Sequence, residues 1–102
     1  GDCPTKGQEC TLNYEGRLED GTVFDTSRTH GEPLKVRIGE GSVIEGWDKG
    51  VMAMKLGEKA DLFIKAKYGY GDMGSPPKIP GGATLVFTVE LIQINDRRPT
   101  RW

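Results

Sequence analysis

Residues that could carry covalent or metal-assisted chemistry are sparse in this chain. It has one histidine, His30 in the stretch TSRTHGE, and two cysteines, Cys3 and Cys10. A zinc site needs about four clustered ligands, and Ser-His-Asp or Cys-His catalysis needs a histidine beside a positioned nucleophile. The sequence also lacks the strand-to-helix elbow that exposes such a nucleophile. We therefore expect no metal, no cofactor and no covalent catalysis.

A glycine-rich stretch, YGYGDMGSPPKIPGG, is a second place where a ligand-binding motif could lie. Its first three glycines have the G-x-G-x-x-G spacing of dinucleotide-binding loops. Such a loop must open a helix that faces the phosphates, but Pro76 and Pro77 follow instead, and adjacent prolines oppose a helix start. The stretch is better explained as a stiff loop that contains tyrosines.

Aromatic residues stand where the chain is expected to bend. They are Tyr14, Phe24, Trp47, Tyr70 and Phe87. Each alone is more typical of a hydrophobic core than of a site, because aromatic side chains dominate cores. Together they could also line a dry pocket for an apolar ligand with one or two carbonyl groups, to which Tyr70 would add a hydroxyl donor. The residues alone leave both interpretations open.

Hydrophobic periodicity predicts the elements that would position these side chains. Alternating apolar residues predict strands at 10–18, 34–38, 60–66 and 84–94, with a further extended segment at Val23 and Phe24. One helix is expected to begin at Ser42, where Ser42 and Glu45 fit the S-x-x-E capping box, and to stop at Gly57. The prediction is four or more antiparallel strands around one short helix.

Composition limits the class of protein. With 102 residues the chain is long enough for one core and one domain. Fourteen Lys and Arg residues against 15 Asp and Glu residues, with the signs interspersed, indicate neither a nucleic-acid nor a membrane partner. No apolar run approaches the ~20 residues of a membrane span. Two cysteines cannot form a disulfide framework, so we expect reduced thiols in a cytosol-like compartment.

Four separated segments resemble the FKBP-type peptidyl-prolyl cis-trans isomerases, the immunophilins, in the right order and near the family's spacing. They are YEGRLEDGTVFDTSR, VIEGWDKGVMAMKLGE, YGYG and IPGGATLVFTVELI. The resemblance implies an α+β fold in which an antiparallel sheet of five or six strands wraps around one short helix. The family's first strand precedes Gly1 and is expected to be missing. The expected isomerase domain spans residues 1–95, and residues 96–102 are expected to be a C-terminal linker or tail.

The resemblance also implies a shallow apolar pocket between helix and sheet that admits a prolyl ring. The residues expected to act in catalysis are Tyr14, Phe24, Asp25, Trp47, Tyr70 and Phe87. Those expected to bind substrate or macrolide are Tyr14, Phe24, Asp25, Leu34, Val43, Ile44, Trp47, Tyr70, Ser75, Ile79 and Phe87. Trp47 is expected to form the floor under the proline. The Ile44 backbone N–H and the Tyr70 hydroxyl are expected to act as hydrogen-bond donors, the hydroxyl to a substrate carbonyl.

Two roles are open for Asp25. A carboxyl group can act as a general acid or base, but rotation of a peptide bond requires no proton transfer, so we favour a supporting role beside Tyr14. His30 stands where the family frequently has an arginine that helps to hold this aspartate. Either His30 contacts Asp25, in which case ligand binding should weaken as pH rises, or His30 is a solvated loop residue.

The function implied by the resemblance is isomerisation of X-Pro peptide bonds without covalent catalysis. Macrolides such as rapamycin and tacrolimus are expected to fill the same pocket, with ternary protein targets as further partners. The alternative is a non-catalytic proline- or macrolide-binding module, or a chaperone domain of a larger immunophilin. The presence of both Trp47 and Tyr70 favours the enzyme. We expect a monomeric domain in the cytoplasm and also in the nucleus.

Overall fold

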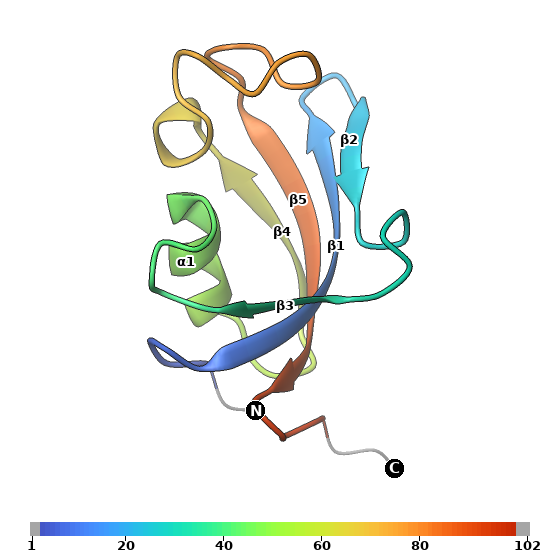
Figure 1. Cartoon of the computed structure of the whole chain (residues 1–102), viewed down its shortest axis with the longest axis vertical. Coiled ribbons are helices and arrows are strands. Elements are labelled where there is room, and N and C mark those ends of the chain that lie inside the picture. Colours follow the sequence, from blue (N-terminus) through green and yellow to red (C-terminus); the bar gives the residue numbers. More distant parts are fainter. Residues whose placement is uncertain (1–2, 100–102) are drawn as a thin grey trace.

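The computed structural model describes residues 3–99, in which one α-helix lies against a sheet of five strands (Figure 1). The elements are β1 (Glu9–Leu18), β2 (Val23–Thr26), β3 (Leu34–Arg37), α1 (Glu45–Met52), β4 (Lys59–Ile64), the 3₁₀ turn η1 (Ala66–Tyr68) and β5 (Leu85–Ile94). All strand pairs are antiparallel, so the expected α+β fold with one short helix is confirmed. No helix in this part of the chain is both long and apolar enough to span a membrane.

Strand β1 pairs with two different strands along one edge. Its first half pairs with β3, and its second half pairs with β2, where Gly16 lies opposite Asp25. Tyr14 falls between the two paired segments, and its backbone bonds Ser27 instead: the Tyr14 N–H donates to Ser27 Oγ at 3.1 Å, and the Ser27 N–H donates to the Tyr14 carbonyl at 3.0 Å. The other edge of β1 pairs with β5, which also pairs with β4. Tyr14 is thereby held at the middle of the sheet.

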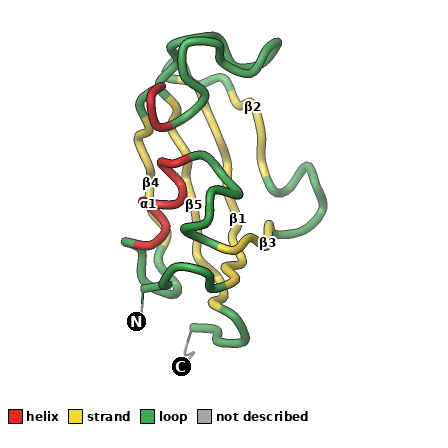
Figure 2. The backbone as a smooth tube through the Cα atoms, turned by 60° about the vertical axis from the view of Figure 1, so that its left-hand side comes forward, coloured by secondary structure: helices red, strands yellow, loops and turns green. Residues whose placement is uncertain are grey.

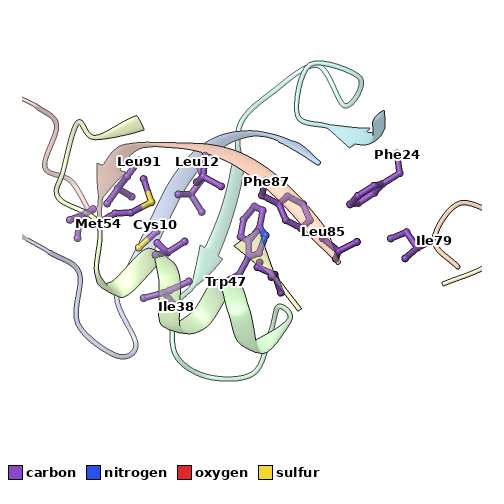
Figure 3. Close-up of a cluster of buried hydrophobic side chains, with 14 residues drawn as sticks. Cys10, Leu12, Phe24, Ile38, Trp47, Met54, Ile79, Leu85, Phe87 and Leu91 are labelled. Atoms are coloured by element: carbon purple, nitrogen blue, oxygen red, sulfur yellow. The ribbon is translucent and has the colours of Figure 1, made fainter. Parts of the chain in front are cut away.

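The core lies between α1 and the sheet, and Figure 2 shows the helix beside β4 and β5. Alternate residues of β5 are buried, as the period of two predicts: Leu85, Phe87, Val89 and Leu91. The helix contributes Trp47 and Val51 to the same cluster, part of which Figure 3 shows. Each buried aliphatic side chain of this kind stabilises the fold by ~1.5–3 kcal/mol relative to exposure.

The predicted helix ends are wrong at both positions. The helix begins at Glu45 behind an Ile44 N-cap that makes no side-chain capping bond, so Ser42 and Glu45 form no capping box. Asp48 ties the helix to the preceding loop instead, because its carboxylate accepts the N–H groups of Gly39 and Gly41 at 2.8 and 2.9 Å. The helix ends at Met52. Gly57, with φ of +91°, makes the later turn into β4 and donates its N–H to the Leu91 carbonyl.

The two cysteines are free but lie in different surroundings. Cys10 is buried on β1, and burial, with a smaller contribution from the Glu9 charge, raises the pKa of its thiol to about 11. Cys3 is exposed. Because the thiolate is the reactive form, Cys3 should react with an alkylating reagent well before Cys10 does. Mass spectrometry of the folded domain in iodoacetamide checks this, with Cys3→Ser as the control; rapid labelling of that variant without denaturant would contradict it.

Candidate active site

Aromatic rings enclose a cavity of about 340 Å³ between the start of α1 and the sheet. Its lining residues are Tyr14, Phe24, Asp25, Leu34, Ser42, Val43, Ile44, Trp47, Tyr70 and Phe87. The Trp47 indole is only 4% exposed, and it makes edge contacts with Tyr14 and Phe87, each with 5.2 Å between ring centroids. Figure 3 shows Trp47 and Phe87 facing one another. The cavity has the size of a small ligand site, and the edge-to-face contacts between its rings stabilise their arrangement.

Gly16 on β1 makes room for two of the aromatic walls. Phe24 and Phe87 meet edge to face at 5.4 Å between ring centroids. A Cβ atom at Gly16 would lie 2.7 Å from the Phe24 Cζ and 2.7 Å from the Phe87 Cε1, closer than such atoms can approach. The Phe24 and Phe87 rings can therefore occupy these positions only because residue 16 has no side chain.

Three hydrogen-bond donors at the cavity are without partners in the part of the chain that the structure describes. The Ile44 backbone N–H and the Tyr70 hydroxyl donate to none of residues 3–99. The Trp47 Nε1–H is buried and likewise has no partner among these residues. Tyr70 is 39% exposed at the cavity mouth. A ligand with carbonyl groups can satisfy donors of this kind at little cost, since no existing bond must break.

Asp25 is held by hydrogen bonds from three sides. Its carboxylate accepts the Tyr14 hydroxyl at 2.8 Å, the His30 Nε2 lies 2.9 Å from its Oδ1, and the Thr26 N–H donates to it at 2.9 Å. Burial acts to raise the pKa of Asp25, but these bonds and the charge of His30 outweigh it and lower the pKa below the ordinary value. Burial and the bond to Asp25 raise the pKa of Tyr14 far above its ordinary range.

The state of these groups bears on what Asp25 can do. An ionised Asp25 has no proton to donate near neutral pH, and its two oxygens already take part in three hydrogen bonds, which favours support of Tyr14 over acid-base chemistry. Of the two alternatives for His30, the contact with Asp25 is the one that the structure contains. The turn after β2 brings it about, because the His30 N–H donates to the Ser27 carbonyl and folds the loop back.

The loop of residues 68–82 crosses the end of the sheet that Figure 1 shows at the top. Its shape comes from backbone bonds: Ser75 and Ile79 exchange N–H···O bonds of 2.8 and 3.1 Å, and the Gly82 N–H donates to the Gly71 carbonyl. Ser75 and Ile79 line a neighbouring hollow rather than the cavity itself, and their expected part in ligand binding stays a prediction. Tyr70 borders both spaces.

The other residues expected at the site do meet at the cavity. They are Tyr14, Phe24, Asp25, Leu34, Val43, Ile44, Trp47, Tyr70 and Phe87. Sequence reasoning missed Ser42 as a lining residue because its spacing to Glu45 was explained by helix capping. Its position beside Val43, in the segment that enters the helix, is the signal that could have indicated it. The roles of all these residues in binding or catalysis stay predictions.

Comparison with known proteins identifies the family. Residues 1–92 match the family of the FKBP-type peptidyl-prolyl cis-trans isomerases. The chain therefore belongs to this family, which is an enzyme class. The structure is also similar to the crystal structure of AtFKBP13, with a TM-score of 0.88 and 40% identity over 92% of this chain and 84% of that chain.

Relatives in sequence come from several kinds of organism. The FK506-binding protein 1A of Aspergillus fumigatus is 55% identical over 95% of this chain and 87% of its own length. The peptidyl-prolyl cis-trans isomerase FKBP15-2 of Arabidopsis thaliana is 52% identical over 90% of this chain, which spans 56% of that relative. The human peptidyl-prolyl cis-trans isomerase FKBP2 is 51% identical over 93% of this chain and 69% of its own length.

Proposed function

We propose that this domain accelerates the cis-trans isomerisation of X-Pro peptide bonds, with the proline in the cavity above Trp47. The observation that carries the proposal is the combination of an apolar aromatic cavity with two unengaged donors at its edge, the Ile44 N–H and the Tyr70 hydroxyl. A prolyl ring is apolar and is flanked by carbonyl groups on both sides. The cavity therefore matches a prolyl peptide in both respects, apolar surface and hydrogen bonding.

Catalysis in such a cavity requires no covalent step. The barrier to peptide rotation is ~18–20 kcal/mol because resonance must be broken, and unassisted X-Pro isomers exchange over tens to hundreds of seconds. The twisted amide is less dipolar than either planar isomer, so a dry aromatic wall stabilises it relative to the planar forms. Each ~1.4 kcal/mol of selective binding to the twisted state raises the rate tenfold.

An NMR exchange assay on a short Leu-Pro peptide tests the proposed function. We expect cis and trans signals to exchange much faster with catalytic amounts of the domain than without it. If the domain is folded and the peptide shifts on titration, yet exchange keeps its spontaneous rate, the protein is a proline-binding module and the proposed activity is wrong.

We further propose that macrolides such as rapamycin and tacrolimus occupy the same cavity. The support is the cavity's apolar lining and the name of the Aspergillus fumigatus relative, which says that this relative binds FK506. Binding should change the fluorescence of Trp47, because the ligand would lie on the indole. Trp102, which lies outside the described residues, also emits, so the titration uses a chain that ends before it. Unchanged emission together with no heat in calorimetry would contradict the proposal.

Replacement of Tyr70 by phenylalanine should weaken ligand binding without unfolding the domain. The hydroxyl makes no bond within residues 3–99, and the ring is 39% exposed, so its loss leaves no buried partner unsatisfied. We expect affinity for a proline peptide to fall by the worth of one hydrogen bond, ~0.5–1.5 kcal/mol, with Tm unchanged. Calorimetry and thermal unfolding measure the two effects. A large drop in Tm would show instead that Tyr70 supports the core.

Ligand binding should weaken modestly as pH rises through neutrality. A charged imidazole at His30 would hold Asp25, and thereby Tyr14, more firmly than a neutral one, and histidine is the side chain whose charge can change in the physiological pH range. The side chains of His30 and Asp25 are 59% and 40% exposed, so water screens their pairing, and Glu32 and Lys35 of the same hollow add opposing charges. We expect a loss of about two- to fivefold in rapamycin affinity between about pH 6 and about pH 8.

A variant with a permanent charge is the control for this pH dependence. His30→Arg should bind equally at both pH values, since a guanidinium stays charged throughout. Isothermal calorimetry in matched buffers gives the constants. The same slope in the arginine variant would mean that some other group titrates.

A further inference from the structure

The hollow beside the cavity contains a cation without a carboxylate partner. Lys78 lines it together with Tyr70, Phe24 and Asp25, all three of which also border the aromatic cavity. The hollow has a volume of about 340 Å³, comparable with the cavity itself. The two spaces therefore adjoin at Phe24, Asp25 and Tyr70.

The loop geometry places the Lys78 ammonium at this border. Ser75 and Ile79 pair through their backbones and close a tight turn, and Lys78 lies in that turn. Its Nζ turns back to donate to the Phe24 carbonyl at 3.4 Å, at the wall of the cavity. One long bond to a carbonyl leaves the other ammonium protons available.

No protein carboxylate neutralises this ammonium among residues 3–99. Asp25, the one acidic residue among those that line the hollow, already accepts bonds from Tyr14 and His30. Lys78 therefore presents a positive charge to whatever occupies the hollow. Because Lys78 is exposed, water and salt screen its attraction for an opposite charge, and we expect the strength of a surface ion pair.

We propose that Lys78 is a specificity-determining residue that selects a carboxylate side chain, Asp or Glu, at the residue before the proline of the substrate. The inference rests on the proposed function and on its assignment of the Tyr70 hydroxyl to a substrate carbonyl. The carbonyl of the bond that rotates belongs to the residue before the proline. If Tyr70 binds that carbonyl, the residue that carries it stands at the border with the hollow, where its side chain meets Lys78.

Peptides that differ only in charge at this position test the proposal. For the whole domain we expect a kcat/KM for Glu-Pro that exceeds that for Gln-Pro by about two- to fivefold at low ionic strength, and a ratio that declines as salt screens the pair. The Lys78→Gln variant should bring the ratio to one. The Lys78→Glu variant should invert it and favour Lys-Pro over Gln-Pro.

Lys35 provides the matched control. It lines a different hollow, the one that contains His30, so Lys35→Gln removes the same charge away from Lys78 and should keep the ratio. A ratio of one in the parent domain, a ratio that survives Lys78→Gln, or a ratio lost in Lys35→Gln would overturn the proposal.

Failure of the proposed function gives a different result. In that case the Leu-Pro peptide is not isomerised faster than it is alone, and no kcat/KM can be compared. The dissociation constants of the Glu-Pro and Gln-Pro peptides, measured by NMR titration, then take the place of kcat/KM. Tighter binding of Glu-Pro that depends on Lys78 would uphold the selection of a carboxylate, and equal binding would overturn it.

Discussion

Replacement of Trp47 by alanine should abolish tight ligand binding and lower the free energy of unfolding by ~3–5 kcal/mol. The indole is 4% exposed and contacts Tyr14 and Phe87, so its removal leaves a void at the centre of the aromatic cluster. Tm should fall by more than ~10 °C for a domain of this size. Thermal unfolding measures the stability. Calorimetry of rapamycin binding, at a temperature where the variant is folded, measures the affinity.

The Trp47→Phe variant distinguishes the two roles of Trp47, as the floor under the ligand and as a residue of the core. A phenyl ring keeps an aromatic surface under the ligand and removes the indole N–H, which is buried without a partner among residues 3–99. Because an unsatisfied buried donor costs free energy, its removal offsets part of the lost packing. We expect this variant to keep most of the stability and part of the affinity. Normal ligand binding by a folded Trp47→Ala domain would show that Trp47 is a core residue only.

A methyl group at Gly16 should distort the cavity by displacing two of its aromatic walls, Phe24 and Phe87. In the Gly16→Ala variant the new Cβ overlaps the Phe24 and Phe87 rings, which must shift into the space that the ligand needs. Overpacking of this kind costs ~1–3 kcal/mol of stability. The φ of Gly16 is not in the left-handed region, so crowding rather than backbone strain accounts for the loss. We expect at least a tenfold loss of kcat/KM on Leu-Pro peptides, equivalent to ~1.4 kcal/mol.

A remote core variant provides the comparison for Gly16. Leu91 is fully buried in β5 at the end of the cluster away from the cavity (Figure 3), and Leu91→Ala should cost ~2–5 kcal/mol. With its shape at the cavity unchanged, this variant should keep its activity at temperatures where it is folded. If Leu91→Ala loses as much activity as Gly16→Ala does, general destabilisation explains both, and Gly16 has no specific part in shaping the cavity.

Local periodicity predicted most of the fold but not its helix ends. Alternation of apolar residues predicted β5 well, because its buried face repeats at every second residue. The capping box at Ser42 failed because a short motif competes with tertiary bonds, here those that Asp48 makes to the loop of Gly39 and Gly41. Such bonds join segments that hydrophobic periodicity treats as independent.

The resemblance to the family indicated which residues line the cavity, while the residues alone left both pocket and core open and made core the more typical place for each aromatic. Trp47 in fact serves both, since it is buried in the core and lines the cavity. The contact of His30 with Asp25 was open because it depends on how the turn after β2 folds back. The separation of Ser75 and Ile79 from the cavity depends likewise on the path of the loop, which composition does not specify.

The backbone bonds of the loop at residues 68–82 bear on how such domains can diverge. Its path relies on main-chain groups and on glycines such as Gly74 and Gly81, where any side chain would collide with neighbouring backbone. The exposed side chains of Met73 and Ser75 make no hydrogen bond within residues 3–99, and that of Lys78 makes only the long one to the Phe24 carbonyl. Mutations at these three positions should therefore carry only a small folding penalty. A duplicated gene could change the side chains beside the cavity here in single steps while it keeps the aromatic cavity itself.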